Sequence, residues 1–314
     1  MDTYSRLTTL YGNLYNRKGI PFWMLTPARR IVRSLANKKI PSFFAKEAST
    51  KPKQRSLCAD RKVVVSLTSF PSRLEKLWLV IESLLRQTCP PDKIVLWLCT
   101  DEVSSLEEVP ASLRKEQETG IFEIRFVPES FRSHLKYYHA FKEFPEDIVI
   151  TVDDDIIYHP RTIECLLEEH LKHPDAIITN LAREVKYTNG QLSEYNSWPQ
   201  LNGYLDSEEV FLLGYGGVLY STPPLCPEVL NWQAFTSVCK LADDVWLNAI
   251  ARIKGIKVIC NSSQIIFIEI KNNNTVRLKY KNVGSSMNDQ QIVAVDTYCK
   301  QTFGRSVFDI HNRQ

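Results

Sequence analysis

The sequence predicts an α/β protein with a doubly wound, mostly parallel sheet. Strand-like runs of apolar or alternating residues occupy positions 63–67, 94–98, 122–127, 148–152 and 176–179. Segments with helical character separate them, at 72–85, 107–119, 133–142 and 160–171. Prolines mark several boundaries, among them the pair Pro90-Pro91 and the single Pro145. Strands that alternate with helices in this way are typical of a parallel sheet.

Each element of the first half has its own local signal. The run 63–67 is a β-branched strand, and the turn from Thr68 to Pro71 leads into an apolar helical face. The strand at 94–98 completes a β-α-β unit, which requires the two strands to be parallel. Pro160 suits the first turn of the next helix. The strand at 148–152 is apolar and mostly β-branched, and we expect it to be buried and central.

The second half has a different character. Positions 189–209 are polar and rich in turn residues, and Gly214, Gly216 and Gly217 follow. A helix is expected over 243–254, with Gly255 after its end. Short strands are expected at 256–259 and 265–268, and the tail from position 288 looks partly helical. We therefore expect one domain over residues 57–314.

Residues 1–56 differ in composition from the rest. They hold 12 Lys and Arg against 2 Asp and Glu, a net charge of +10, whereas the remainder carries −7. Positions 29–36 predict a short basic amphipathic helix. It would lie on an anionic membrane surface, pack on the body or belong to a solvated tail. The acidic body argues against nucleic-acid binding.

Cysteine usage and hydropathy limit the location. The eight cysteines contain no C-x-x-C and no zinc spacing, so we expect reduced thiols, which fits the cytoplasm. No secretory signal and no run long enough to span a bilayer is present. The expected location is cytoplasmic, with peripheral contact to the inner face of the membrane if the basic segment binds lipid.

Asp153, Asp154 and Asp155 directly follow the central strand. Buried charges need partners, so these carboxylates must meet water, a cation or a basic side chain. If the strand continues, Asp153 and Asp155 share one side, where hard oxygen ligands suit Mg²⁺ or Mn²⁺. The alternative is an acidic loop tip ahead of the helix at Pro160.

Asp243 and Asp244 open the helix at 243–254. Taken alone, this pattern predicts that Asp243 is the N-cap of the helix and Asp244 an acid of its first turn. If they lie near the metal site, one of them suits a general base that takes a proton from a hydroxyl. The glycines at 214–217 either line a substrate pocket or form a turn. Their spacing fits neither a dinucleotide fingerprint nor a P-loop.

The ordered set of V-V-S-L-T-S, V-D-D-D, G-G-V-L-Y and A-D-D-V-W-L resembles nucleotide-sugar glycosyltransferases of GT-A fold. It is most similar to bacterial family-2-like transferases of capsule, O-antigen or lipopolysaccharide synthesis. The resemblance covers about residues 60–300. It implies a Rossmann-like nucleotide half and an acceptor half, and transfer from a UDP-sugar to a hydroxyl of a saccharide or glycolipid.

The resemblance also implies roles for individual residues. Asp153 and Asp155 would hold Mn²⁺ or Mg²⁺ on the donor diphosphate, with His311 as a third ligand. Asp244 would be the base of an inverting reaction, with Asp243 as the alternative base or only a cap. The donor would be bound by Thr68, Ser69, Arg73, Asp101, Lys136 and Asp154, with Gly216 and Gly217 lining the sugar and acceptor pocket.

Three alternatives stay open at this point. The aspartate pattern also resembles exostosin-type transferases, which retain anomeric configuration. A sugar-phosphate nucleotidyltransferase would use a similar layer, but it needs a glycine-rich basic loop after the first strand. A carbohydrate-binding protein without activity would not need carboxylates at both positions.

Overall fold

The computed structural model describes residues 1–15, 20–47, 61–201, 203–221, 225–261, 267–271 and 287–308. Its centre is an eight-stranded sheet in the order β10-β13-β6-β12-β4-β1-β2-β3. These strands are β1 (Val63–Thr68), β2 (Lys93–Cys99), β3 (Phe122–Val127), β4 (Ile148–Thr151), β6 (Ile177–Thr179), β10 (Leu205–Asp206), β12 (Val218–Ser221) and β13 (Val258–Cys260). The predicted α/β class with one doubly wound sheet is confirmed.

The sheet has a parallel half and a mixed half. Strands β3, β2, β1 and β4 are parallel neighbours, as the alternation of strands and helices predicted. Strand β12 then runs antiparallel between β4 and β6, and β10 pairs antiparallel with β13. Because β1 to β4 point the same way, their carboxyl ends meet at one edge, where ligands bind in open α/β sheets.

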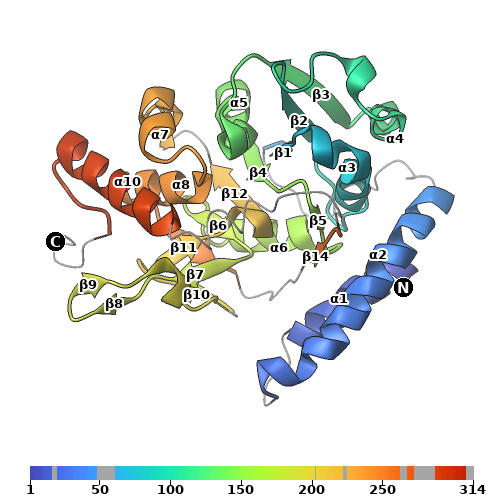
Figure 1. Ribbon diagram of the computed structural model, residues 1–314, viewed down its shortest axis with the longest axis horizontal. Coiled ribbons are helices and arrows are strands. Elements are labelled where there is room, and N and C mark those ends of the chain that lie inside the picture. The colour runs from blue at the N-terminus through green and yellow to red at the C-terminus, as the bar shows by residue number, and fades with distance from the viewer. Residues whose placement is uncertain are drawn as a thin grey trace.

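Helices cover this sheet on both faces (Figure 1), and the smaller strands pair in two-stranded sheets of their own: β11-β7, β14-β5 and β8-β9. Residues of β4 are all buried, which confirms its predicted central place. The helices are α3 (Pro71–Leu85), α4 (Ala111–Lys115), α5 (Leu135–Glu143), α6 (Thr162–His170), α7 (Trp232–Val238), α8 (Asp243–Ile253) and α10 (Met287–Phe303). The smaller strands are β5 (Ile156–Ile157), β7 (Ala182–Glu184), β8 (Tyr187–Thr188), β9 (Gln191–Leu192), β11 (Val210–Leu212) and β14 (Ile268–Glu269).

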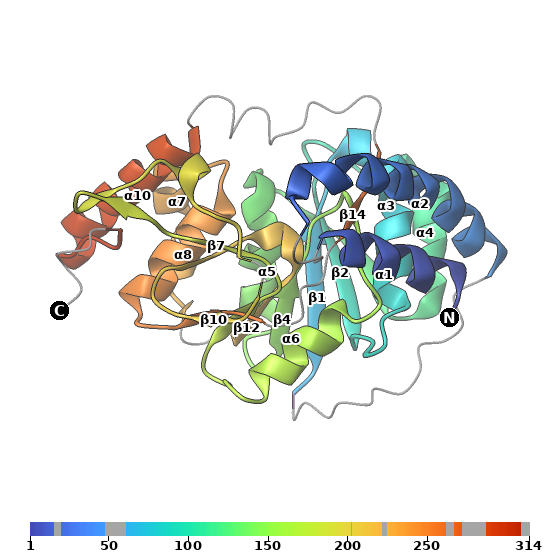
Figure 2. The ribbon, with the colours of Figure 1, turned by 90° about the horizontal axis from the view of Figure 1, so that it is seen from below.

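The basic N-terminal segment forms a helical hairpin. Helix α1 (Thr3–Tyr15) and helix α2 (Thr26–Lys46) are joined through the short 3-10 helix η1 (Phe22–Leu25). Figure 2 shows both helices beside α3, at the opposite end of the molecule from α10. We call residues 1–46 the N-terminal hairpin.

One face of the hairpin belongs to the hydrophobic core. The residues buried there are Tyr4 and Tyr11 from α1, with Val32, Ala36, Ile40 and Phe44 from α2. The Tyr4 hydroxyl donates a hydrogen bond to the Tyr158 carbonyl, and Arg33 forms an ion pair with Glu269 at 3.1 Å. Of the three arrangements considered for this segment, the structure shows packing on the body. The basic helix predicted at positions 29–36 is part of the longer helix α2.

The seven described cysteines form no disulfide with one another. Among the described residues, no helix combines the length and the apolar composition needed to cross a membrane.

Because the hairpin contributes to the core, a cavity in its buried face should destabilise the protein. We predict that Ile40→Ala lowers the free energy of unfolding by about 2–4 kcal/mol. The matched control is Ile31→Ala on the exposed side of the same helix, which should change it by less than about 0.5 kcal/mol. Urea unfolding followed by tryptophan fluorescence measures both. Equal unfolding curves for the two variants would show that the hairpin does not contribute to the core.

Candidate active site

The three aspartates after β4 lie in a turn. Strand β4 ends at Thr151, and β5 begins at Ile156. The alternation of a strand therefore does not extend to Asp153 and Asp155, and the expectation that they share one side on those grounds is wrong. Asp153 is paired with Lys136, whereas Asp154 and Asp155 both meet Arg73.

Arg73, in the first turn of α3, holds two of the carboxylates. Its guanidinium forms ion pairs with Asp154 and, at 3.1 Å, with Asp155. The Ser69 hydroxyl donates to the second oxygen of buried Asp154 at 2.6 Å. Burial raises the pKa of Asp155 to about 7; Arg73 opposes this, and the Asp154 and Asp153 charges add to it. The turn therefore carries more negative charge than Arg73 can balance.

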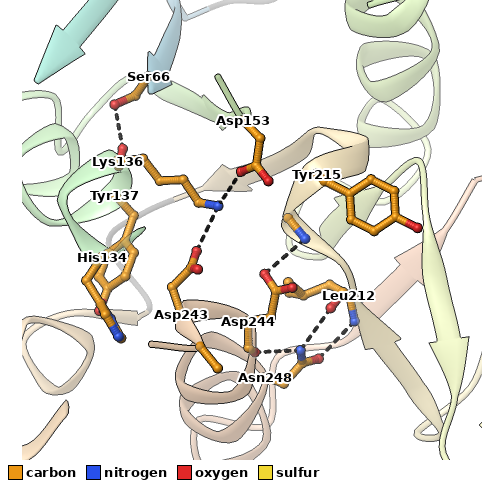
Figure 3. A network of polar contacts seen from close by, with 12 residues as sticks. Ser66, His134, Lys136, Tyr137, Asp153, Leu212, Tyr215, Asp243, Asp244 and Asn248 are labelled. Atoms are coloured by element: carbon orange, nitrogen blue, oxygen red, sulfur yellow. Dashed lines mark hydrogen bonds and ion pairs between the residues drawn. The ribbon is translucent and has the colours of Figure 1, made fainter. Parts of the chain in front are cut away.

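Lys136 joins this turn to the second acidic pair (Figure 3). Its ammonium lies 2.8 Å from an Asp153 oxygen and 2.9 Å from an Asp243 oxygen. Burial by itself would lower the pKa of Lys136, but Asp153 and Asp243 outweigh it and raise the value well above normal. The side chain is thus a buried, permanently charged bridge between two parts of the sequence.

Asp243 and Asp244 occupy the first turn of α8, where the helix dipole favours negative charge. The N-cap is Ala242, so the reading of Asp243 as a cap is wrong. Asp243 is buried against Lys136, and Asp244 accepts a hydrogen bond from the Gly214 amide at 2.9 Å. Burial, followed by the charge of Asp243, raises the pKa of Asp244 well above its usual range.

The glycine segment approaches this acidic pair through Gly214. A Cβ at that position would stand 2.7 Å from an Asp244 oxygen and 2.8 Å from the Lys136 nitrogen. Gly216 instead packs against Leu181, and Gly217 has a φ of +84°, a backbone region that favours glycine. The role predicted for Gly216 and Gly217 as pocket lining stays a prediction.

A cavity of about 340 Å³ opens at the carboxyl edge of β1 to β4. Its lining includes Thr68, Ser69, Arg73, Lys136, Asp153 and Asp154, all predicted donor or metal residues. The Ser133 hydroxyl at its wall is buried without a hydrogen-bond partner among the described residues, as is the Arg73 Nε. Unpartnered polar atoms in a cavity wall are suited to a polar ligand.

The predicted Asp101 lies outside the cavity lining, and several lining residues were missed. Asp101 is exposed and is not part of the lining, which has Glu102 in its place. His311 lies outside the described residues. Sequence reasoning also missed Ser130, Arg132 and Ser133, which follow β3. Their position after the third parallel strand is the signal that would have found them.

The donor set suits a divalent cation bound together with phosphate. In the described part of the chain, Asp153, Asp154, Asp155 and Asp243 form ion pairs with Arg73 or Lys136, and Asp244 accepts a hydrogen bond from the Gly214 amide. Among the described residues, no group of three or more His, Cys, Asp or Glu side chains is arranged to hold a metal. Mg²⁺ commonly takes only one or two carboxylates, with water and substrate phosphates as its other ligands. The carboxylates of this site fit a cation that is held by one or two of them and by substrate phosphate oxygens.

Comparison with known proteins gives a distant structural likeness. No protein-family model matches the chain, and no curated protein matches its sequence. One similar solved structure is the mannosyltransferase PcManGT from Pyrobaculum calidifontis in complex with GDP-Man and Mn²⁺. It has a TM-score of 0.47 and 14% sequence identity, over 87% of this chain and 81% of that one.

His134 lies at the N-terminal end of α5 and contacts the segment that precedes Asp243. It is buried, stacks on Phe235 at a centroid distance of 4.2 Å, and lies 2.7 Å from the Cys239 carbonyl oxygen and 2.9 Å from the Tyr137 hydroxyl. Burial lowers its pKa to about 4, although Asp243 raises it slightly. The neutral ring thus ties the start of α5 to the segment before Asp243.

We predict that His134 makes stability depend on pH. The unfolded residue gains its proton near pH 6.5 and the folded one only near 4, so its contribution is complete above 6.5 and is lost as pH falls towards 4. Between pH 7 and pH 5 this loss should reach about 2 kcal/mol. Urea titrations of the protein and of His134→Gln measure it, since the variant should lack this share of the pH dependence. The same pH slope in both proteins would contradict the assignment.

Proposed function

We propose that this protein is a metal-dependent glycosyltransferase that moves a sugar from a nucleotide-diphosphate donor to a hydroxyl group. The observation that carries the proposal is the Lys136 bridge. It brings the acidic turn of a nucleotide-sized cavity next to a second carboxylate pair. The acidic turn suits a cation that binds the leaving diphosphate. The pair Asp243 and Asp244 suits removal of a proton from the acceptor hydroxyl. A group-transfer enzyme needs both side by side.

The donor would lie in the cavity at the ends of β1 to β4. We place the diphosphate near Arg73 and Lys136, with Asp153 and Asp155 holding Mn²⁺ or Mg²⁺. The cation would neutralise charge that develops on the leaving nucleoside diphosphate. Thr68, Ser69 and the Ser133 hydroxyl would contact the nucleoside. We favour a UDP-sugar as donor, as the motif resemblance implies.

Asp244 is the better candidate for the general base of an inverting reaction. Asp243 is buried and neutralised by Lys136, whereas Asp244 is partly exposed and anchored by the Gly214 amide. A raised pKa gives Asp244 the proton affinity that a base needs, and the nearby Lys136 charge favours its ionised form. The acceptor we propose is a saccharide or glycolipid of bacterial polysaccharide synthesis.

The donor site can be tested by replacing its carboxylates. Asp153→Asn or Asp155→Asn should lower metal-dependent hydrolysis of the donor about 100-fold or more, because charge on the diphosphate is no longer balanced. A thermal-shift screen of UDP- and GDP-sugars with Mn²⁺ selects the donor. The control is Asp175→Asn, an exposed acid before β6. Full activity of the wild type in EDTA would contradict the metal role.

The base is tested separately. Asp244→Asn keeps an oxygen to accept from Gly214 but cannot take a proton, so transfer should fall about 10²–10⁴-fold while donor affinity is unchanged. Isothermal titration of the donor and NMR of the product measure these two quantities and the anomeric outcome. Transfer at the wild-type rate with retained configuration would favour the exostosin-like alternative. Release of pyrophosphate would indicate a nucleotidyltransferase.

A further inference from the structure

Exposed apolar side chains gather on the N-terminal hairpin. Among the described residues, six of the eleven exposed large hydrophobic side chains lie within positions 1–35. Trp23 and Met24, in η1 at the hairpin turn, are 73% and 54% exposed. Single exposed apolar residues are normal on a protein surface, but a group of them marks an interaction site.

Helix α2 has two opposite faces. The buried stripe contains Val32, Ala36 and Ile40. Ile31, 61% exposed, and Leu35, 45% exposed, are spaced four apart and lie on the outward side, with Lys38 three residues further along the same stripe. Helix α2 therefore carries exposed apolar side chains on its outer face, in addition to those of the turn.

The exposed side chains of the hairpin are also predominantly basic. Exposed cations of the hairpin are Arg6, Arg30, Lys38, Lys39 and Lys46, and its described part contains only Asp2 as an acid, with Glu47 directly after it. Contact between the hairpins of two copies of this chain would bring two basic faces together, which like charges oppose. An anionic bilayer is complementary to both properties, because it attracts the cations and accepts apolar side chains at its interface.

The hairpin is joined to the acidic turn on both sides. Tyr4 donates to the Tyr158 carbonyl, and the Tyr158 hydroxyl accepts from the Asp153 amide at 2.7 Å. On the other side, the Asn37 side chain binds β14 through the Glu269 carbonyl at 3.1 Å and the Lys271 amide at 2.7 Å.

The same strand reaches the site. The Ile270 amide, directly after β14, donates to the Asp155 carbonyl at 2.8 Å. In Figure 1 the turn end of the hairpin lies away from the central sheet, while its sides run along the body. A surface that binds this turn would thus hold the active site at a set distance and orientation.

We propose that the N-terminal hairpin docks on an anionic lipid bilayer through Trp23, Met24, Ile31 and Leu35, with Lys38 and Lys39 on the headgroups. The chain lies on the membrane and does not span it. Docking holds the site at the lipid surface, where an acceptor sugar carried by a lipid would be within reach. This last step rests on the proposed function, whereas the docking does not.

The test is co-sedimentation of the full chain with vesicles. Wild type should bind vesicles of phosphatidylglycerol and phosphatidylcholine more tightly than pure phosphatidylcholine. Trp23→Ser with Met24→Ser should weaken binding about tenfold or more, because apolar area no longer enters the interface. Lys38→Gln and Lys39→Gln should each weaken it about fivefold.

Matched controls come from α10, at the far end of the molecule. Val293→Ser removes an equally exposed apolar side chain, and Lys300→Gln removes an exposed cation. Both should bind like wild type. Thermal unfolding confirms that all variants are folded, since every substituted side chain is exposed.

Three results would overturn the docking proposal: equal binding by hairpin and control variants, binding that ignores lipid charge, or self-association of the lipid-free protein that Trp23→Ser abolishes. Donor hydrolysis without vesicles should be the same in wild type and the hairpin variants. Vesicle binding by a wild type that hydrolyses no donor would remove the proposed function and leave the docking intact.

Discussion

The charge of Lys136 is the constraint on which the site depends. Its ammonium is buried, so it needs both Asp153 and Asp243, and each of them needs it. Removing one partner of a buried ion pair leaves an uncompensated charge, which costs about 3–5 kcal/mol. The Lys136 carbonyl also accepts from Ser66 of β1, so the same residue connects sheet, helix α5 and helix α8. Two motifs distant in sequence are therefore held at one place.

The acidic turn is fixed from several directions. Arg73 and Ser69 hold Asp154 from the start of α3, and Lys136 holds Asp153 from α5. The N-terminal hairpin secures the backbone behind the turn through Tyr158 and β14. A turn with three consecutive carboxylates repels itself, and these contacts keep it in a single arrangement. The hairpin is thus part of the site's support as well as of the core.

Much of the fold could be predicted because its signals are local. The apolar run of β4 and the β-α-β alternation require only nearest neighbours, and a chain of parallel strands places their ends at one edge. The motif resemblance pointed to Thr68, Ser69, Arg73 and Lys136, and all four line the cavity at that edge. The resemblance also pointed to Asp101, but the cavity lining has Glu102 there, because the chain turns after β2.

The sequence by itself determined the α/β class, the acidic end of the central strand and the basic character of the N-terminus, since composition and periodicity record these directly. Only the tertiary structure decided which carboxylate meets which cation and which glycine approaches Asp244. It also decided that the hairpin packs on the body. Those outcomes depend on contacts between residues far apart in the chain, and side-chain direction in a turn follows no fixed period. The sequence could therefore predict the acidic turn as a candidate site, but not which side chain pairs with each of its carboxylates.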